Sequence, residues 1–104
     1  MRASFAYEPS MIVGVCTIQL ALPENGSLKG KRSILKSLMA RIRQEFNVSI
    51  AEVDDNDLWQ SAVLGVVCVS NDSKYAHGLL SKVVNWLEQS HYDIEIVEYD
   101  ITLC

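Results

Sequence analysis

The residues of this chain that are best placed to do chemistry are six cations within one short segment. No Asp or Glu occurs between Asn25 and Gln44, and the cations there are Lys29, Lys31, Arg32, Lys36, Arg41 and Arg43. The segment carries a charge of +6 and the rest of the chain carries −10, which gives the net charge of −4. The sequence therefore separates a basic segment from an acidic remainder.

The basic segment has the pattern of a helix start, where the helix dipole opposes positive side chains. An exposed cation there costs roughly 0.3–1 kcal/mol. A bound anion would offset this cost, and a helix N-terminus offers it free N–H groups. We therefore predict contact with phosphates, above all those of RNA or the ribosome. The predicted contact residues are Lys29, Lys31, Arg32, Lys36 and Arg43.

An alternative for the basic segment is a solvated cationic face that balances acidic strands of the same molecule or of a partner. On a helical wheel Lys29, Arg32, Lys36 and Arg43 share one flank. Lys31 instead points towards the apolar side of the helix, so its ammonium group is expected to reach out at the end of the side chain. An acidic isoelectric point near 5.0 argues against a general nucleic-acid coat and leaves a local basic patch open.

Other residues of catalytic or metal-binding type form no constellation. Asp54, Asp55 and Asp57 could hold Ca²⁺ or Mg²⁺, but they lack the spacing and terminal Glu of a calcium loop. Asp and Asn are also frequent in hairpin turns for conformational reasons. His77 and His91 stand in no motif with Cys or Ser. We predict no metal site, no cofactor and no catalytic residue.

The three cysteines, Cys16, Cys68 and Cys104, form an odd set without metal-ligand spacing. Cys16 and Cys68 lie among apolar residues, where the pKa of a thiol rises. We expect reduced, mostly buried thiols and a cytoplasmic protein. No apolar run approaches the ~18 residues that span a bilayer, so no membrane contact is predicted.

The chain has 104 residues, of which 49% are hydrophobic, and this is enough for one domain with its own core. Residues 1–10 lack the apolar region of a signal peptide and are expected to form a flexible extension. Residues 11–104 are expected to form the single domain. Its predicted strands are 11–22, 47–53, 58–70 and 92–103, and its predicted helices are 28–46, after Ser27 as N-cap, and a second one after the capping stretch 71–73.

The order of these elements is βαββαβ, which predicts an α+β fold, the ferredoxin-like sandwich. Right-handed crossovers interleave two split βαβ units into one antiparallel sheet with strand order 4-1-3-2 and both helices on one face. Polarity supports this order independently. The first and third strands are apolar on both faces and belong in the centre, whereas the second and fourth carry acids and belong at the edges.

The face of the sheet away from the helices should carry an apolar patch that is rarely left in water. We predict that a second copy of the chain covers it, with the N-terminal extension as a weaker candidate. The predicted interface consists of Val13, Val15, Trp59, Val63 and Val67. Trp59 could instead stack on a base, but the central strands lack the aromatic signature of RNA-recognition sheets. We therefore interpret Trp59 as a packing or dimer anchor.

The segment SLKGKRSILKSLMARIRQEFNVSIAEVDDNDLWQSAVLGV resembles the YlxP-like proteins, a small bacterial family of unknown function. The resemblance runs from Met11 to about Leu103 and implies a ferredoxin-like fold and a small cytoplasmic protein. It also implies genes among those for transcription, translation initiation and ribosome maturation. Relatives tend to carry an acid where this chain has Gly30, so a capping box is missing here. The first turn should be looser and more electropositive, and the helix could begin at Leu28 or only near Lys31.

Three functions follow from these features. The first is a non-enzymatic binding module that contacts RNA through the basic helix. The second is a small homo-oligomeric scaffold or regulatory protein without nucleic acid. The third is an acylphosphatase-like hydrolase, which requires a phosphate-cradling Arg and an Asn that positions water. The loop 23–27 has Asn25 but no Arg, and the second strand has only Asn47 at its start.

Overall fold

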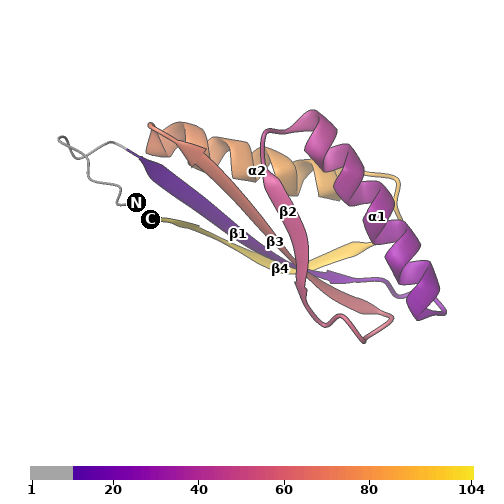
Figure 1. Ribbon diagram of the computed structural model, residues 1–104. Coiled ribbons are helices and arrows are strands. Elements are labelled where there is room, and N and C mark those ends of the chain that lie inside the picture. Colours follow the sequence, from indigo (N-terminus) through magenta and orange to yellow (C-terminus); the bar gives the residue numbers. More distant parts are fainter. Residues whose placement is uncertain (1–10) are drawn as a thin grey trace, which may run out of the picture.

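The computed structural model describes residues 11–104, and the predicted extension, residues 1–10, lies outside them. The chain forms a four-stranded antiparallel sheet and two helices (Figure 1). In chain order the elements are β1 (Ile12–Ala21), α1 (Leu28–Glu45), β2 (Ser49–Asp54), β3 (Ser61–Ser70), α2 (Ser73–Gln89) and β4 (Glu95–Leu103). The predicted βαββαβ order and the ferredoxin-like fold are confirmed.

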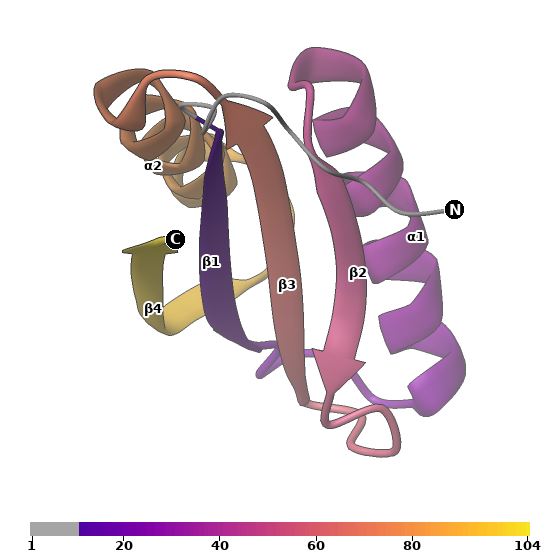
Figure 2. The same ribbon diagram turned by 60° about the vertical axis from the view of Figure 1, so that its left-hand side comes forward.

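The strands lie in the order β2-β3-β1-β4, which is the predicted order 4-1-3-2 read from the other edge. The uncharged strands β1 and β3 occupy the centre, and the acidic strands form the two edges. α1 packs beside the edge strand β2, and α2 covers β1, β3 and β4 (Figure 2). This arrangement places the basic helix next to a free sheet edge.

The boundaries of α1 follow from its caps. Ser27 is extended, and its Oγ accepts a hydrogen bond from the Gly30 N–H at 2.9 Å. The helix therefore begins at Leu28, despite Gly30, and the predicted Ser27 cap is confirmed. It ends where Phe46 turns extended, with the Phe46 N–H bonded to the Ile42 carbonyl.

Two strands begin three residues later than the sequence pattern predicts. β3 starts at Ser61 and not at Leu58, and β4 starts at Glu95 and not at Tyr92. Before β3 the chain forms a compact loop in which Asp55 adopts φ 61° and the Leu58 N–H bonds to the Asp55 carbonyl. The apolar side chains of Leu58 and Trp59 have the pattern of a strand start, but both residues belong to this loop. Trp59 lies in the loop.

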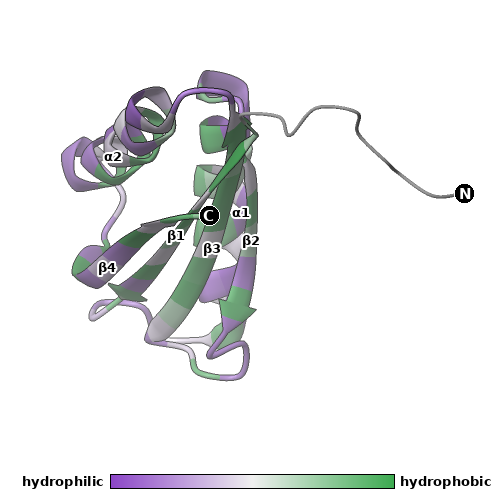
Figure 3. Ribbon diagram, turned by 90° about the vertical axis from the view of Figure 1, so that its left-hand side faces the viewer, coloured by the Kyte–Doolittle hydropathy of each residue, from purple (hydrophilic) through white to green (hydrophobic). Residues whose placement is uncertain are grey.

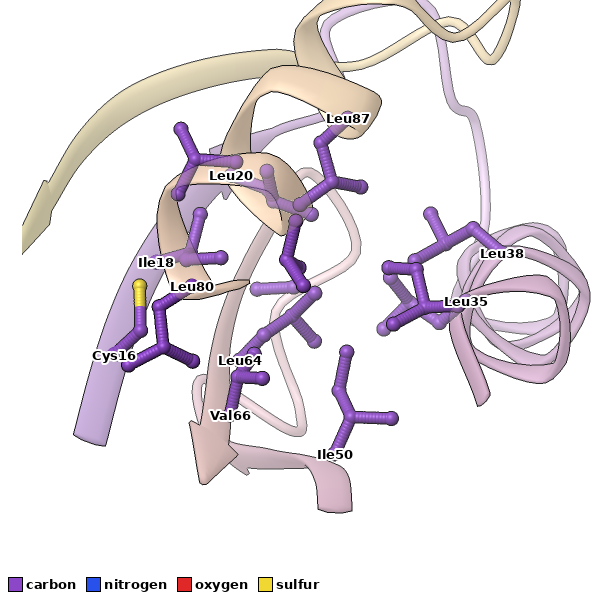
Figure 4. Packing of buried hydrophobic residues seen from close by; sticks show 14 of the residues in the cluster. Cys16, Ile18, Leu20, Leu35, Leu38, Ile50, Leu64, Val66, Leu80 and Leu87 are labelled. Atoms are coloured by element: carbon purple, nitrogen blue, oxygen red, sulfur yellow. The ribbon is translucent and has the colours of Figure 1, made fainter. Parts of the chain in front are cut away.

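The core lies between the helices and the sheet, and alternate residues of the central strands fill it (Figure 4). β1 contributes Cys16, Ile18 and Leu20, which occupy alternate positions of the strand and are all fully buried. Leucines of both helices, among them Leu35 and Leu80, pack against these strands in one cluster. Both helices therefore cover the same face and leave the other face without a helix.

Candidate functional site

The outer flank of α1 carries three cations in solvent. Lys29, Arg32 and Lys36 are exposed, and the first turn of the helix contains no acid. They recur every three to four residues, so they form one stripe along about 10 Å of the helix axis. Their positive charge is uncompensated locally, because the Lys31–Glu52 pair is the one salt bridge within residues 11–104. We call Lys29, Arg32 and Lys36 the basic stripe.

The structure removes Lys31 from the predicted anion-binding set. Its side chain is 0% exposed, and its Nζ lies 2.8 Å from Oε2 of Glu52. The ammonium group also lies within hydrogen-bonding distance of the carbonyl oxygens of Asp55 (2.7 Å) and Asn56 (3.3 Å) in the β2–β3 loop and of Ser61 (3.1 Å) at the start of β3. A buried charge is tolerated only when it is paired and hydrogen-bonded, and Lys31 meets both conditions inside the molecule.

The sequence itself carries a signal for this buried role. Lys31 falls in the apolar sector of the helical wheel, which indicates burial and not reach into solvent. Glu52 on β2 and the polar loop after it supply a carboxylate and turn carbonyls, the partners that a buried ammonium requires. Only the packing of α1 against β2 brings these groups together.

Arg43 is exposed, but one of its N–H groups is already used in a hydrogen bond within the molecule. Its Nη2 donates to the Ile50 carbonyl at 2.8 Å, on the free edge of β2. An Arg over an unpaired edge carbonyl protects that edge from pairing with another strand. The guanidinium group retains further N–H donors, so Arg43 can still extend the basic stripe towards the end of the helix. Arg41 points to the other flank, with its guanidinium carbon 5.8 Å from the ring centroid of Trp86.

The loop before α1 is tied to the β2–β3 loop by amide side chains. Nδ2 of Asn25 donates to the carbonyl groups of Ser27 (2.6 Å) and Trp59 (2.5 Å). Nε2 of Gln60 donates to the carbonyl groups of Pro23 and Asn25, both at 3.1 Å. The position of Trp59 relative to the start of α1 is therefore fixed by hydrogen bonds, and not by membership of β3.

Gly30 makes this connection possible. A Cβ built on Gly30 would lie only 2.4 Å from Oδ1 of Asn25, a distance that forces the amide to move. The absence of a side chain at position 30 thus leaves room for the Asn25 bridge between the helix start and the Trp59 carbonyl. The sequence indicated a missing capping box at this position and gave no sign of the bridge.

The acidic turn has structural roles in the loop. Asp54 Oδ1 accepts the Asp55 N–H at 2.8 Å, and Asp55 Oδ2 accepts the Ser61 hydroxyl at 2.7 Å. No group of three or more His, Cys, Asp or Glu side chains within residues 11–104 is arranged to hold a metal ion. The carboxylates of this turn therefore stabilise the loop that Lys31 anchors.

The remaining residues of catalytic type lie in separate elements or loops of the fold. Burial, together with the charge of Asp100, raises the pKa of the Cys16 thiol to about 11, which leaves no thiolate at neutral pH. His91 stacks on Tyr92 with ring centroids 5.4 Å apart. Asn25 precedes α1 and Asn47 follows it, so the two candidate asparagines lie at opposite ends of a helix of 18 residues, and the loop that holds Asn25 has no Arg beside it in sequence.

A shallow depression of about 400 Å³ lies on the sheet face away from the helices. Thr17, Gln19, Val63, Glu98, Tyr99 and Asp100 line it. Its two carboxylates belong to β4 and oppose the binding of an anion. The depression is therefore acidic and lies on the sheet, whereas the basic stripe is cationic and lies on α1. None of the helices in the part of the chain described here is long and apolar enough to cross a membrane.

Comparison with known proteins places the chain in a family. The family described as "Protein of unknown function (DUF503)" matches residues 13–101. The uncharacterized protein YlxP of Bacillus subtilis (strain 168) is 31% identical over 77 residues, which cover 74% of this chain and 84% of YlxP. The de novo designed protein Foldit4 shares the fold with a TM-score of 0.50 at 16% identity, covering 88% of this chain and 96% of the design. The chain is therefore a member of the DUF503 family, as its resemblance to YlxP-like proteins predicted.

Proposed function

We propose that this protein is a non-enzymatic module that binds RNA through the basic stripe of α1. The observation that carries the proposal is the stripe itself: Lys29, Arg32 and Lys36 lie in solvent on one flank and have no carboxylate partner within residues 11–104. Lys31, the neighbouring cation, shows the contrast, because Glu52 neutralises it inside the fold.

The geometry suits a phosphate backbone better than a small anion. A compact anion would be held by groups that converge on one point, whereas these three cations follow the helix axis in a row. A row of cations neutralises successive phosphates and releases their counterions on binding. The stripe begins at the N-terminal turn of α1, where the helix dipole also favours negative charge. Arg43 extends the row, because its guanidinium group has further N–H groups besides the one that donates to the Ile50 carbonyl.

Ribosomal RNA is the RNA class that we favour. The support is the resemblance to YlxP-like proteins, whose genes lie among those for translation initiation and ribosome maturation. Such a ligand would place the protein in the cytoplasm. A non-enzymatic role is supported by the setting of the Ser–His pair on α2: Oγ of Ser81 and Nδ1 of His77 are 3.5 Å apart on an exposed surface, and neither has a further side-chain hydrogen bond among residues 11–104.

The test is a binding titration of labelled ribosomal RNA fragments at increasing salt. Three phosphate contacts on a single strand predict a slope of log K against log salt of about −2, with measurable binding at about 50 mM salt. Arg32→Glu/Lys36→Glu should abolish binding. The matched control is Lys74→Glu/Lys82→Glu, which changes the net charge equally but on α2, and which should bind nearly as the unaltered protein does.

Two outcomes would contradict the proposal. One is absence of binding by the unaltered protein at about 50 mM salt. The other is equal loss of binding in both double variants, which would mean that overall charge and not the stripe attracts RNA. A variant with Lys29, Arg32 and Lys36 all changed to Glu also separates this function from a scaffold. If that variant no longer assembles, the stripe is part of a protein interface.

A further inference from the structure

The sheet face opposite the helices carries a continuous valine surface. β1 and β3 contain no charged residue. Their register places Val13 beside Val69 and Val15 beside Val67. On the neighbouring strand β2, the side chain of Val53 extends over Gly65, where an added Cβ would meet it at 3.0 Å. Valines from three strands therefore form one patch, and the colouring of Figure 3 shows that hydrophobic residues predominate along β1 and β3.

This patch is open to solvent in a single copy of the chain. Val67, Val53 and Val69 are 36%, 58% and 63% exposed, and Val13, Val15 and Val63 are half-buried. Trp59, also predicted for this surface, precedes β3 in the β2–β3 loop and is 48% exposed. The valines are the strand residues of the patch. Contiguous apolar patches of more than a few hundred Å² are uncommon on monomers and mark interaction sites.

The charges at the border of the patch restrict what can cover it. Asp54 lies opposite Val63 on one side, and Glu98 and Asp100 lie opposite Gln19 and Thr17 on the other. All three are acids, so this face repels phosphates and anionic lipid surfaces. RNA and membranes are thereby disfavoured, and a protein surface with a flat apolar centre is left as the matching occupant.

The size of the face matches what a stable dimer needs. β1 and β3 have ten residues each, β2 has six and β4 has nine. At about 3.3 Å per residue and about 4.8 Å between strands, the face offers about 550 Å² per copy. A pair of copies buries about 1,100 Å², which clears the about 1,000 Å² expected of a specific interface. A second copy presents the same valines on an equally flat surface, and two sheets pack well face to face at about 10 Å.

We propose that this face is the interface of a homodimer in which two sheets pack through Val13, Val15, Val63, Val67 and Val69. The two α1 helices then lie on the outside of the pair, and both basic stripes stay in solvent. The inference does not depend on RNA binding, because the patch and the stripe lie on different layers of the molecule. It would hold equally for a scaffold protein.

The experiment is sedimentation equilibrium of the full chain over a wide range of concentration. The unaltered protein should sediment at twice the chain mass of 11.6 kDa. Val67→Lys and Val69→Lys should each weaken the dimer by at least about a hundredfold, because two-fold symmetry buries two ammonium groups at once. The matched control is Tyr75→Lys, which changes a side chain of α2 that is 59% exposed and should leave the dimer intact.

A monomer at every concentration would overturn the proposal, as would a dimer that survives both valine changes. Circular dichroism of each variant shows whether it is folded. Both valines are already open to solvent in one copy, so a lysine there is compatible with the fold of a monomer. Val69 is near the end of β3 and is the more exposed of the two, so Val69→Lys decides the question if Val67→Lys does not fold.

Discussion

The ammonium nitrogen of Lys31 lies 2.8 Å from Oε2 of Glu52, and both groups are enclosed between α1 and the β2–β3 loop. The two residues are 21 positions apart in the chain. Their contact links the first turn of the basic helix to the edge strand. The Asp55 and Asn56 carbonyl groups link it to the loop that carries Trp59, and the Ser61 carbonyl group links it to the start of β3. Lys31 thus stabilises the packing of α1 against β2, while the neighbouring cations Lys29 and Arg32 remain in solvent.

Replacing Lys31 should destabilise the protein strongly. Lys31→Ala leaves the Glu52 carboxylate, which is 15% exposed, without its partner and deprives loop carbonyl groups of a donor. Breaking a buried pair in this way costs about 3–5 kcal/mol. Urea unfolding of Lys31→Ala and of the exposed control Lys36→Ala measures the difference, and the control should lie within about 0.5 kcal/mol of the unaltered protein. Equal stabilities for the two variants would contradict the buried role.

Gly30→Ala should fail to give the stabilisation that a helical Gly→Ala change normally gives. Alanine is better than glycine in a helix by about 1 kcal/mol, but a Cβ at position 30 displaces the Asn25 amide from its two carbonyl acceptors. The matched control is Gly78→Ala in α2, where nothing lies within 4 Å of the added Cβ. The control should stabilise, and Gly30→Ala should be neutral or destabilising in thermal unfolding.

A double-mutant cycle checks the cause of this difference. In an Asn25→Ala background the amide is already absent, so Gly30→Ala should then stabilise the protein as Gly78→Ala does. Additive effects of Asn25→Ala and Gly30→Ala would show that the two residues are not coupled.

Gly14→Ala should destabilise the core. A Cβ at this buried position of β1 would lie 2.9 Å from Cδ1 of Leu80 and 3.0 Å from Sγ of Cys68. Overpacking of this kind costs about 1–3 kcal/mol. Gly26→Ala, in the loop before α1 with nothing within 4 Å, serves as the control and should have little effect on the urea midpoint. A stabilised Gly14→Ala variant would mean that α2 and β1 are not in the close contact described here.

Cys16 should make the stability of the protein fall in alkaline solution. Burial, with a contribution from Asp100, raises the pKa of this thiol from 9.0 to about 11. The unfolded thiol ionises near pH 9 while the folded one stays neutral, so its contribution is complete below pH 9 and is lost as the pH rises to about 11. The loss amounts to at most about 3 kcal/mol. In Cys16→Ala the free energy of unfolding should therefore fall less steeply between these two pH values.

Much of the architecture could be read from local patterns. The apolar segments, the Ser27 cap and the acid-free central strands predicted the element order and the sheet order. These features depend on periodicity and on capping within a few residues of sequence. The start of β3 could not be read in the same way, because Leu58 and Trp59 are apolar but belong to a loop that distant residues hold.

The sequence by itself determined that six cations would lie on one helix and that acids would lie elsewhere, because side-chain type and helical periodicity are local properties. Only the tertiary structure decided what each cation does. Lys31 is neutralised because α1 packs where Glu52 and the loop carbonyls converge, Arg43 reaches the edge of β2, and Arg41 meets Trp86. Lys29, Arg32 and Lys36 are exposed, because among the helices and strands of residues 11–104 it is β2 that α1 packs beside, and β2 does not cover that flank. The partner of a charge depends on contacts between segments far apart in the chain, and no pattern within one helix contains them.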